Sequence, residues 1–269
     1  MKTEQIDGAT RMYVIIGDPI SAVRSPAVFN AMFARRNINA VLVPLHVAAS
    51  DLTAVWVGLK AMRNLDGVVV TMPHKMAMCE LVDELGTNGR VVGAINAARR
   101  RSDGRWEGDM FDGIGCVHGL MAQGHEVAGR DVFLLGVGGA GAAVATALAQ
   151  AGVKRLVIAD VDTTRRDRVV DRVRAAYPTT TVEAGTLENG SFDLAINATP
   201  LGMRAGDPLP FDPSRLPPTT LIVDVITKPE LTPLLELAQK TGHAIHSGKH
   251  MHHGQAISVA AFFGFDLNE

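Results

Sequence analysis

The chain has few cysteines, little net charge and no long apolar run. Its two cysteines, Cys79 and Cys116, lack a metal-like spacing, and we expect both to be thiols in a cytoplasmic protein. The net charge of -2 argues against a nucleic-acid partner. No apolar run approaches the roughly 20 residues of a membrane span, and the polar residues 1–7 are unlike a signal peptide. We therefore expect neither a membrane nor a nucleic-acid partner.

The most informative stretch is residues 131–160. An apolar run at 131–135 precedes the glycine-rich 136–141, which leads into the alanine-rich 142–151. A second apolar run at 155–159 ends at Asp160. This order of strand, glycine turn, helix, strand and acidic residue predicts a dinucleotide-binding βαβ unit.

Each glycine of this turn has a physical purpose. Gly136 permits the tight turn, Gly138 lets the backbone approach a pyrophosphate, and Gly141 lets helix and strand pack closely. The amides at the helix N-terminus then face the phosphates. The alternative interpretation is a glycine turn in a βαβ unit that binds nothing.

The first 70 residues alternate between strand and helix patterns. Strands are predicted at 12–16, 40–45 and 67–71, and the unbroken apolar character of the third favours a parallel strand covered on both faces. Ser25 and Ser50 are predicted to cap two helices, the second ending near Lys60. The expected buried face of the first helix is Val28, Phe29, Met32 and Phe33.

Two charged residues stand out in the next segment. Pro73 is expected to open a helix to about Leu85 with Lys75 in its first turn, where a cation opposes the helix dipole. Lys75 is either a solvated surface residue or an amine used for proton transfer. Strands are predicted at 91–97 and 104–107. Asp112 precedes a helical pattern and is either an N-cap or a site residue.

The remaining chain completes the second sheet. Helices are predicted at 163–177, 232–240 and 251–263, and strands at 192–196, 221–225 and 244–245, with the last helix packing back on the first domain. His246, His250, His252 and His253 are close in sequence, but no acidic partner has the spacing of a zinc helix. We therefore expect no metal site.

The chain resembles the shikimate and quinate dehydrogenase family from about Tyr13 to Phe263. The resemblance is carried by short motifs in a fixed order. They are Gly17-Asp-Pro-Ile with Ser25-Pro26, Val70-Thr-Met-Pro-His-Lys75, Gly93-Ala-Ile-Asn96, Asp112-Gly-Ile-Gly115, Gly136-Val-Gly-Gly-Ala140, Asn197-Ala-Thr-Pro-Leu-Gly-Met203, Gly248 and Gly254-Gln255. It implies two α/β domains: a substrate domain, residues 1–113 completed by 249–269, and a Rossmann domain at 114–248.

The resemblance also implies roles for single residues. Lys75 and Asp112 match the catalytic pair of an enzyme that oxidises a ring hydroxyl with a nicotinamide cofactor. The implied substrate contacts are Ser25, Thr71, Asn96, Gln255 and the position of Thr227. The implied cofactor contacts are Gly136, Gly138, Gly139, Ala140, Asp160, Asp162, Thr199, Val225 and Gly248.

The departures from the family cluster in the substrate positions. Val23 replaces a serine and Thr227 replaces a tyrosine, and both lost groups bind the shikimate carboxylate in the family. Val69 replaces an asparagine, and Met110-Phe111 replaces Asn-Thr. A buried carboxylate without donors costs several kcal/mol. We therefore expect a shikimate dehydrogenase-like subgroup acting on a related cyclic polyol acid, with Arg24 and Lys249 as other possible carboxylate partners.

The segment after the second Rossmann strand bears on cofactor choice. NADP-binding members of the family carry Asn-Arg-Thr there, and this chain has Asp160-Val-Asp162. A carboxylate suits the ribose hydroxyls of NAD. We therefore predict NAD, with NADP possible through Arg165, Arg166 or Arg168.

Two other functions remain open. One is a catalytically silent ligand sensor of the same fold, which would not need both Lys75 and Asp112. The other is a folate-type dehydrogenase, which the motifs at Asp112 and at 197–203 disfavour. A monomer or a homodimer is expected.

Overall fold

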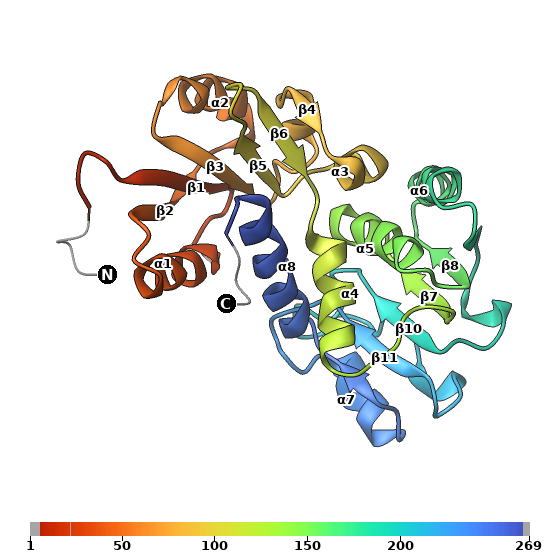
Figure 1. The fold of residues 1–269 in the computed structure, drawn as a ribbon. Coiled ribbons are helices and arrows are strands. Elements are labelled where there is room, and N and C mark those ends of the chain that lie inside the picture. Colours follow the sequence, from red (N-terminus) through yellow and green to blue (C-terminus); the bar gives the residue numbers. More distant parts are fainter. Residues whose placement is uncertain (1–5, 22, 266–269) are drawn as a thin grey trace. The chain divides into compact units, whose positions relative to one another are not determined.

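The computed structural model describes residues 6–21 and 23–265, whose helices and strands form two units (Figure 1). The first unit comprises Met1–Phe111 and Ala256–Glu269, and the second comprises Asp112–Gln255. Each unit contains a six-stranded sheet. Helix α8 (Lys249–Phe262) begins in the second unit and ends in the first. The predicted α/β fold with two domains is confirmed.

The sheet of the first unit is mixed. Its strand order is β2-β1-β3-β5-β6-β4. Strands β1, β2 and β3 are parallel, whereas β5 is antiparallel to both β3 and β6. The strands are β1 (Arg11–Gly17), β2 (Ala40–His46), β3 (Leu65–Val70), β4 (Glu84–Leu85), β5 (Ala97–Arg100) and β6 (Trp106–Asp109). The expected parallel strand near residue 67 thus has one parallel and one antiparallel neighbour.

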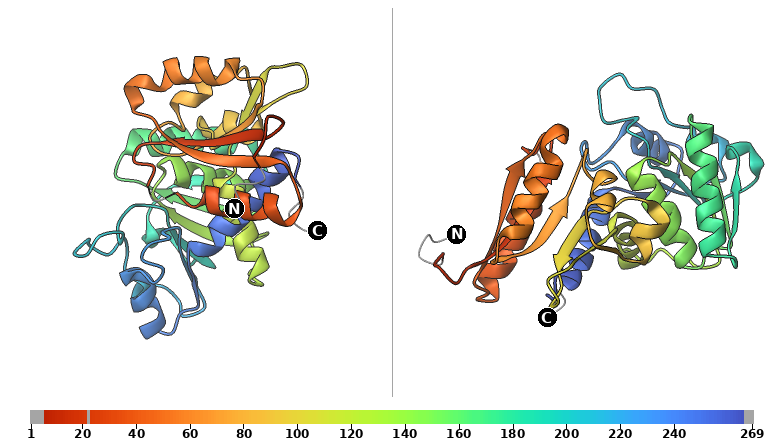
Figure 2. Two further views of the ribbon diagram at one scale, coloured as in Figure 1. Left: turned by 90° about the vertical axis from the view of Figure 1, so that its left-hand side faces the viewer. Right: turned by 90° about the horizontal axis from the view of Figure 1, so that it is seen from above.

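Helices α1 (Ser25–Arg35) and α2 (Leu52–Ala61) lie on opposite faces of this sheet (Figures 1 and 2). Successive side chains of a strand point to opposite faces. Accordingly, Val14 of β1 belongs to a core with Trp56 of α2. Its neighbour Tyr13 instead contacts the ring of Phe33 of α1, with 5.5 Å between the ring centroids.

Three predictions for helices α1 and α2 are wrong. Neither Ser25 nor Ser50 caps a helix: the residue before α1 is Arg24, and α2 follows the 3-10 helix η2 (Ala49–Asp51). Val28 is 42% exposed, whereas the side chains of Phe29, Met32 and Phe33 are buried as predicted. Adjacent helix residues are about 100° apart, so Val28 faces away from the side that carries Phe29.

The segment after Pro73 does not form the predicted α-helix. It contains turns and a short 3-10 helix, η3 (Ala77–Glu80), before β4 joins the sheet. The carbonyl of Leu81 accepts a hydrogen bond from the Trp56 indole at 2.8 Å, and the side chains of His74 and Met78 are buried. These tertiary contacts outweigh the local helical pattern. The helix N-terminus that we expected to act on Lys75 is therefore absent.

The strand predicted at 91–97 is also wrong, except for its last residue. Helix α3 (Thr87–Val92) ends at Gly93, which has a left-handed φ of 73°. Glycine adopts this conformation at little cost and commonly ends helices. The strand then begins at Ala97, where it pairs with β3 and β6.

The sheet of the second unit is entirely parallel, with the order β12-β11-β10-β7-β8-β9. Its strands are β7 (Asp131–Leu135), β8 (Arg155–Ala159), β9 (Thr181–Ala184), β10 (Leu194–Asn197), β11 (Leu221–Asp224) and β12 (Ile245–His246). Its helices are α4 (Asp112–Ala122), α5 (Gly139–Gln150), α6 (Thr163–Ala176), α7 (Pro233–Lys240) and the start of α8. Strand β9 was not predicted, because of its four residues only Val182 is buried.

No helix among residues 6–21 and 23–265 is both long enough and apolar enough to cross a membrane.

Candidate active site

The second unit contains a pocket of about 540 Å³ at the carboxyl ends of its central strands. Ligands of parallel α/β sheets bind at this edge, where the strand order reverses. The pocket is lined by the glycine turn, the loop after β8 and the loop after β10. Its lining includes Gly136, Gly138, Asp160, Val161, Arg165, Thr199, Leu201 and Pro210. The predicted cofactor residues Gly136, Gly138, Asp160 and Thr199 thus lie around one pocket.

The glycine turn has the close contacts predicted from its sequence. Gly136 has a φ of 93°, and a Cβ atom at Gly141 would lie 2.0 Å from the carbonyl oxygen of Gly136. Any side chain at Gly141 would therefore push the helix away from the turn. A Cβ atom at Gly138 or Gly139 would meet nothing within 4 Å. These two glycines thus leave open space beside the N-terminus of α5, where backbone amides favour an anion.

The carboxylate of Asp160 connects the turn to helix α6. It accepts hydrogen bonds from the amides of Val137 (2.7 Å) and Asp162 (2.8 Å) and from Nη2 of Arg165 (2.7 Å). Burial alone would raise the pKa of Asp160, but these hydrogen bonds outweigh it and lower the pKa below its ordinary value. Asp162 caps α6 by accepting a hydrogen bond from the Arg165 amide.

A buried polar network shapes the loop after β10. Asn197, which is fully buried, accepts hydrogen bonds from the amide (3.0 Å) and hydroxyl (2.7 Å) of Thr199. Its own amide group donates to Asp224, which also accepts from the Thr232 hydroxyl at 2.8 Å. The network holds Thr199 at the pocket rim. Asp224 and Thr232 were not predicted, although a carboxylate at the end of an apolar strand was a usable signal.

Two further predicted cofactor residues lie next to each other. A Cβ atom at Gly248 would lie 2.4 Å from the carbonyl oxygen of Val225 and 2.5 Å from that of Ile226. Only glycine allows this approach of the chain before α8 to the chain after β11. Ala140 is the second residue of α5, next to the glycine turn. Thr227 follows Ile226 and is partly exposed.

Asp112 is the first residue of α4 and only 3% exposed. Its Oδ1 accepts a hydrogen bond of 2.7 Å from Nε2 of Gln255 on α8. The two helices cross at glycines: a Cβ atom at Gly115 would lie 2.6 Å from the backbone nitrogen of Gln255, and one at Gly254 would lie 2.7 Å from the carbonyl oxygen of Gly115. A predicted catalytic residue and a predicted substrate contact are therefore in direct contact.

In the first unit, the predicted site residues Thr71, Lys75 and Asn96 come from neighbouring segments. The carbonyl of Lys75 accepts a hydrogen bond of 2.9 Å from the amide of Ile95, and the carbonyl of Asn96 accepts one of 2.7 Å from the amide of Val70. The fully buried Asn96 side chain accepts a hydrogen bond from the amide of Phe111 at 2.9 Å. Backbone pairing thus brings the segments of these three residues together.

Ser25 is the first residue of α1 and is partly exposed. A polar pair in the first unit, Asp18 and His46, was not predicted. Asp18 directly follows β1, and His46 is the last residue of the parallel strand β2. His46 Nε2 lies 2.7 Å from Asp18 Oδ1. Both are charged or titratable residues at the carboxyl ends of parallel strands, which was a usable signal.

Three histidines of the second unit, His125, His246 and His250, have their rings in contact. The ring centroids of His125 and His246 are 5.6 Å apart, and those of His246 and His250 are 4.9 Å apart. Burial, followed by the neighbouring His250 and His125, lowers the pKa of His246 to about 4. Within the described part of the chain, no three His, Cys, Asp or Glu side chains are arranged to hold a metal ion.

Comparison with known proteins identifies similar sequences and folds. The family model for the shikimate dehydrogenase substrate binding domain matches residues 15–98. The shikimate dehydrogenase (NADP(+)) of Rubrobacter xylanophilus is 38% identical over 258 residues, which are 93% of this chain and 89% of that protein.

Two solved structures extend the likeness to the fold. Shikimate 5-dehydrogenase from Listeria monocytogenes, in complex with shikimate and NAD, has a TM-score of 0.90 and 28% identity, covering 97% of this chain and 94% of that one. Quinate dehydrogenase from Corynebacterium glutamicum, in complex with NAD, has a TM-score of 0.85 and 27% identity, covering 94% and 93%.

Proposed function

This chain belongs to the shikimate and quinate dehydrogenase family, and from that premise we propose that it oxidises a ring hydroxyl of a shikimate- or quinate-like cyclic polyol acid. It is an NAD(P)-dependent dehydrogenase of this type. The proposed proton-transfer pair is Lys75 and Asp112. The observation that supports the pair most directly is the buried Asp112 carboxylate, whose Oδ1 is held at 2.7 Å by Gln255. A carboxylate held in this way is suited to orient an amine.

The division of roles follows from the chemistry. A bound nicotinamide would supply the acceptor for the hydride of the carbinol carbon. The Lys75 amine takes the hydroxyl proton, and Asp112 orients and balances the resulting ammonium. Ser25, Thr71, Asn96 and Gln255 bind the polar groups of the ring. The Gln255 contact with Asp112 then has a second purpose, because it limits the rotation of the carboxylate.

The residues of the second unit fit a dinucleotide. The open space beside Gly138 and Gly139 at the N-terminus of α5 suits a pyrophosphate. Val161, Leu201 and Pro210 give the pocket apolar walls suited to a flat base. We propose that Thr199, Val225 and Gly248 complete the cofactor site. The carboxylates of Asp160 and Asp162 provide the negative charge that favours ribose hydroxyls over a phosphate.

The proposed substrate is a relative of shikimate, because the carboxylate-binding positions have changed. Val23 has no hydrogen-bonding side chain and Thr227 is shorter than the tyrosine of the family. Val69 is 5% exposed and brings a further apolar group to the end of β3. We also propose a cytoplasmic monomer or homodimer without nucleic-acid or membrane partners, in keeping with the net charge of -2.

Cofactor preference can be tested at Val161, which is 99% exposed and lines the pocket. NADP-binding members of the family carry arginine at this position. We predict that the protein prefers NAD and that Val161→Arg raises kcat/KM for NADP relative to NAD about tenfold or more. A charge-assisted hydrogen bond contributes about 1.5–3 kcal/mol, which corresponds to at least about tenfold.

The control for this prediction is Thr164→Arg, which adds the same charge to an exposed position of α6 that does not line the pocket. Steady-state rates with both cofactors are measured for the three proteins. A wild-type preference for NADP, or equal shifts in the two variants, would contradict the assignment.

The proposed activity is tested by assaying shikimate, quinate and amino-substituted relatives for the reduction of NAD and NADP. We expect oxidation of at least one ring hydroxyacid, with shikimate not the best substrate. Tight binding of such an acid without any reduction of either cofactor would refute the enzyme and favour the ligand sensor.

A further inference from the structure

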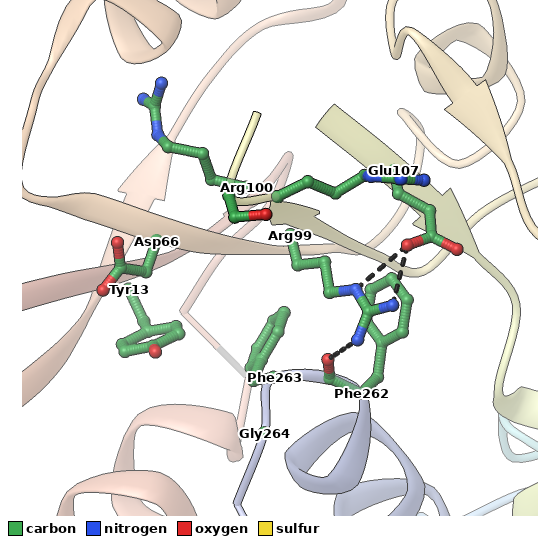
Figure 3. Close-up of a pocket in the computed structure, with 10 residues that line it drawn as sticks. Tyr13, Asp66, Arg99, Arg100, Glu107, Phe262, Phe263 and Gly264 are labelled. Carbon is green, nitrogen blue, oxygen red and sulfur yellow. Dashed lines mark hydrogen bonds and ion pairs between the residues drawn. The ribbon is translucent and has the colours of Figure 1, made fainter. Parts of the chain in front are cut away.

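Arg99, on strand β5 of the first sheet, holds the C-terminal end of helix α8. Its guanidinium donates from Nε (3.0 Å) and Nη2 (2.8 Å) to Glu107, and from Nη1 (2.8 Å) to the carbonyl oxygen of Phe262, the last residue of α8 (Figure 3). The guanidinium carbon also lies 4.4 Å from the centre of the Phe262 ring. One side chain thus joins a strand carboxylate, a helix carbonyl and an aromatic ring.

The physical chemistry of this contact favours a fixed position. A cation near a helix C-terminus interacts favourably with the helix dipole. The planar fork of arginine binds two partners with little further loss of conformational freedom. The side chains of Arg99 and Glu107 are 39% and 21% exposed, so the pair is partly shielded from water. Arg99 therefore caps the C-terminus of α8 from a strand of the sheet.

The residues after α8 strengthen this attachment. The ring of Tyr13 on β1 lies 5.1 Å from that of Phe263 and 5.6 Å from that of Phe265. Phe265 also lies 5.3 Å from Phe33 of α1. Aromatic pairs at such distances stabilise beyond the area that they bury. The end of α8 is therefore seated against β1 and α1 as well as capped by Arg99.

The other part of the same helix carries the Gln255 contact to Asp112. Gln255 precedes Phe262 by seven residues, which is about 10.5 Å of helix rise and almost two full turns. The backbone of α8 touches that of α4 at Gly254 and Gly115. No side chain there can absorb a displacement, so a small axial shift of α8 would change the 2.7 Å contact between Gln255 and Asp112.

We propose that Arg99 is a positioning residue for the reaction. By capping α8 at Phe262 and pairing with Glu107, it fixes the axial position of the helix and so the hydrogen bond from Gln255 to Asp112. This inference rests on the proposed function, in which Asp112 orients Lys75. Arg99 itself acts only through α8 and touches neither substrate nor cofactor.

The test compares Arg99→Gln with the matched variant Arg101→Gln. Arg101 has a similar exposure of 41%, and both arginines line a pocket of about 560 Å³ in the first unit. Arg101, however, pairs with Glu84 and Asp103. Rates are measured with shikimate or quinate, whichever the wild-type protein oxidises faster. We expect Arg99→Gln to lower kcat about tenfold and to displace the pH–rate profile, with KM for the cofactor unchanged. Arg101→Gln should leave kcat and the pH–rate profile unchanged.

Two further measurements distinguish a positioning role of Arg99 from a general effect on folding. Rates are expressed per cofactor-binding site from a binding titration, and the melting temperature is recorded for each variant. Arg99→Lys keeps the cation beside the helix terminus and should restore part of kcat. Equal kcat and pH profiles for Arg99→Gln and Arg101→Gln would overturn the positioning role.

Lys75→Ala, assayed alongside, separates this inference from the proposed function. An inactive Lys75→Ala with a fully active Arg99→Gln overturns the positioning role alone. A fully active Lys75→Ala overturns the proton-transfer pair and the positioning role with it.

Discussion

Lys75→Ala should lower kcat by about a hundredfold or more while cofactor binding stays unchanged, because a positioned general acid or base contributes about 10²–10⁴-fold. The amine is the only group that the proposed mechanism assigns to proton removal. Cofactor binding is unaffected since the glycine turn and its pocket belong to the second unit and Lys75 to the first.

The fold should tolerate this substitution. The Lys75 side chain is partly exposed, and the hydrogen bond from Ile95 reaches its backbone carbonyl, which alanine retains. Lys60→Ala is the control: Lys60 is also partly exposed and lies 5.9 Å from the centre of the Trp56 ring. Turnover numbers across the pH range and cofactor titrations are measured for both. Wild-type turnover in Lys75→Ala would show that another group removes the proton.

Gly141→Val should abolish cofactor binding and destabilise the second unit by about 3 kcal/mol or more. The Cβ atom would meet the carbonyl oxygen of Gly136 at 2.0 Å, and backbone cannot move aside as a flexible side chain can. Helix α5 would have to separate from the turn at which we propose that the pyrophosphate binds. The measurements are thermal unfolding and a cofactor titration.

Gly58→Ala is the matched control for Gly141→Val. Gly58 lies within α2, and a Cβ atom there would meet nothing within 4 Å. This change should leave cofactor binding intact and raise stability slightly, because alanine is favoured over glycine within helices. Cofactor binding by Gly141→Val with wild-type affinity would mean that the close turn is not required.

Patterns with a local cause were the ones that could be predicted from sequence. The turn from Gly136 to Gly141 was predicted because both of these glycines meet a backbone constraint within a few residues. Helix α7 begins as predicted, with Thr232 capping the amide of Leu235. Lys75 and Asp112 were predicted as site residues from the family resemblance, since neither residue has a distinctive local pattern.

The features that escaped prediction depend on residues far apart in the chain. The helix expected after Pro73 was lost to the hydrogen bond from Trp56 to Leu81, 25 residues away. Asn197 and Asp224 are 27 residues apart, and only the parallel pairing of β10 and β11 places them side by side. Arg99 and Phe262 are 163 residues apart, and no periodicity reports such a contact.

The most direct test of the proton-transfer pair is a double-mutant cycle of Lys75→Ala and Asp112→Asn with kcat as the readout. If the amine and the carboxylate act as one unit, the double variant should be no more than about a few-fold slower than the slower single variant. If the two single effects instead multiply in the double variant, the residues act independently and the proposed pair is wrong.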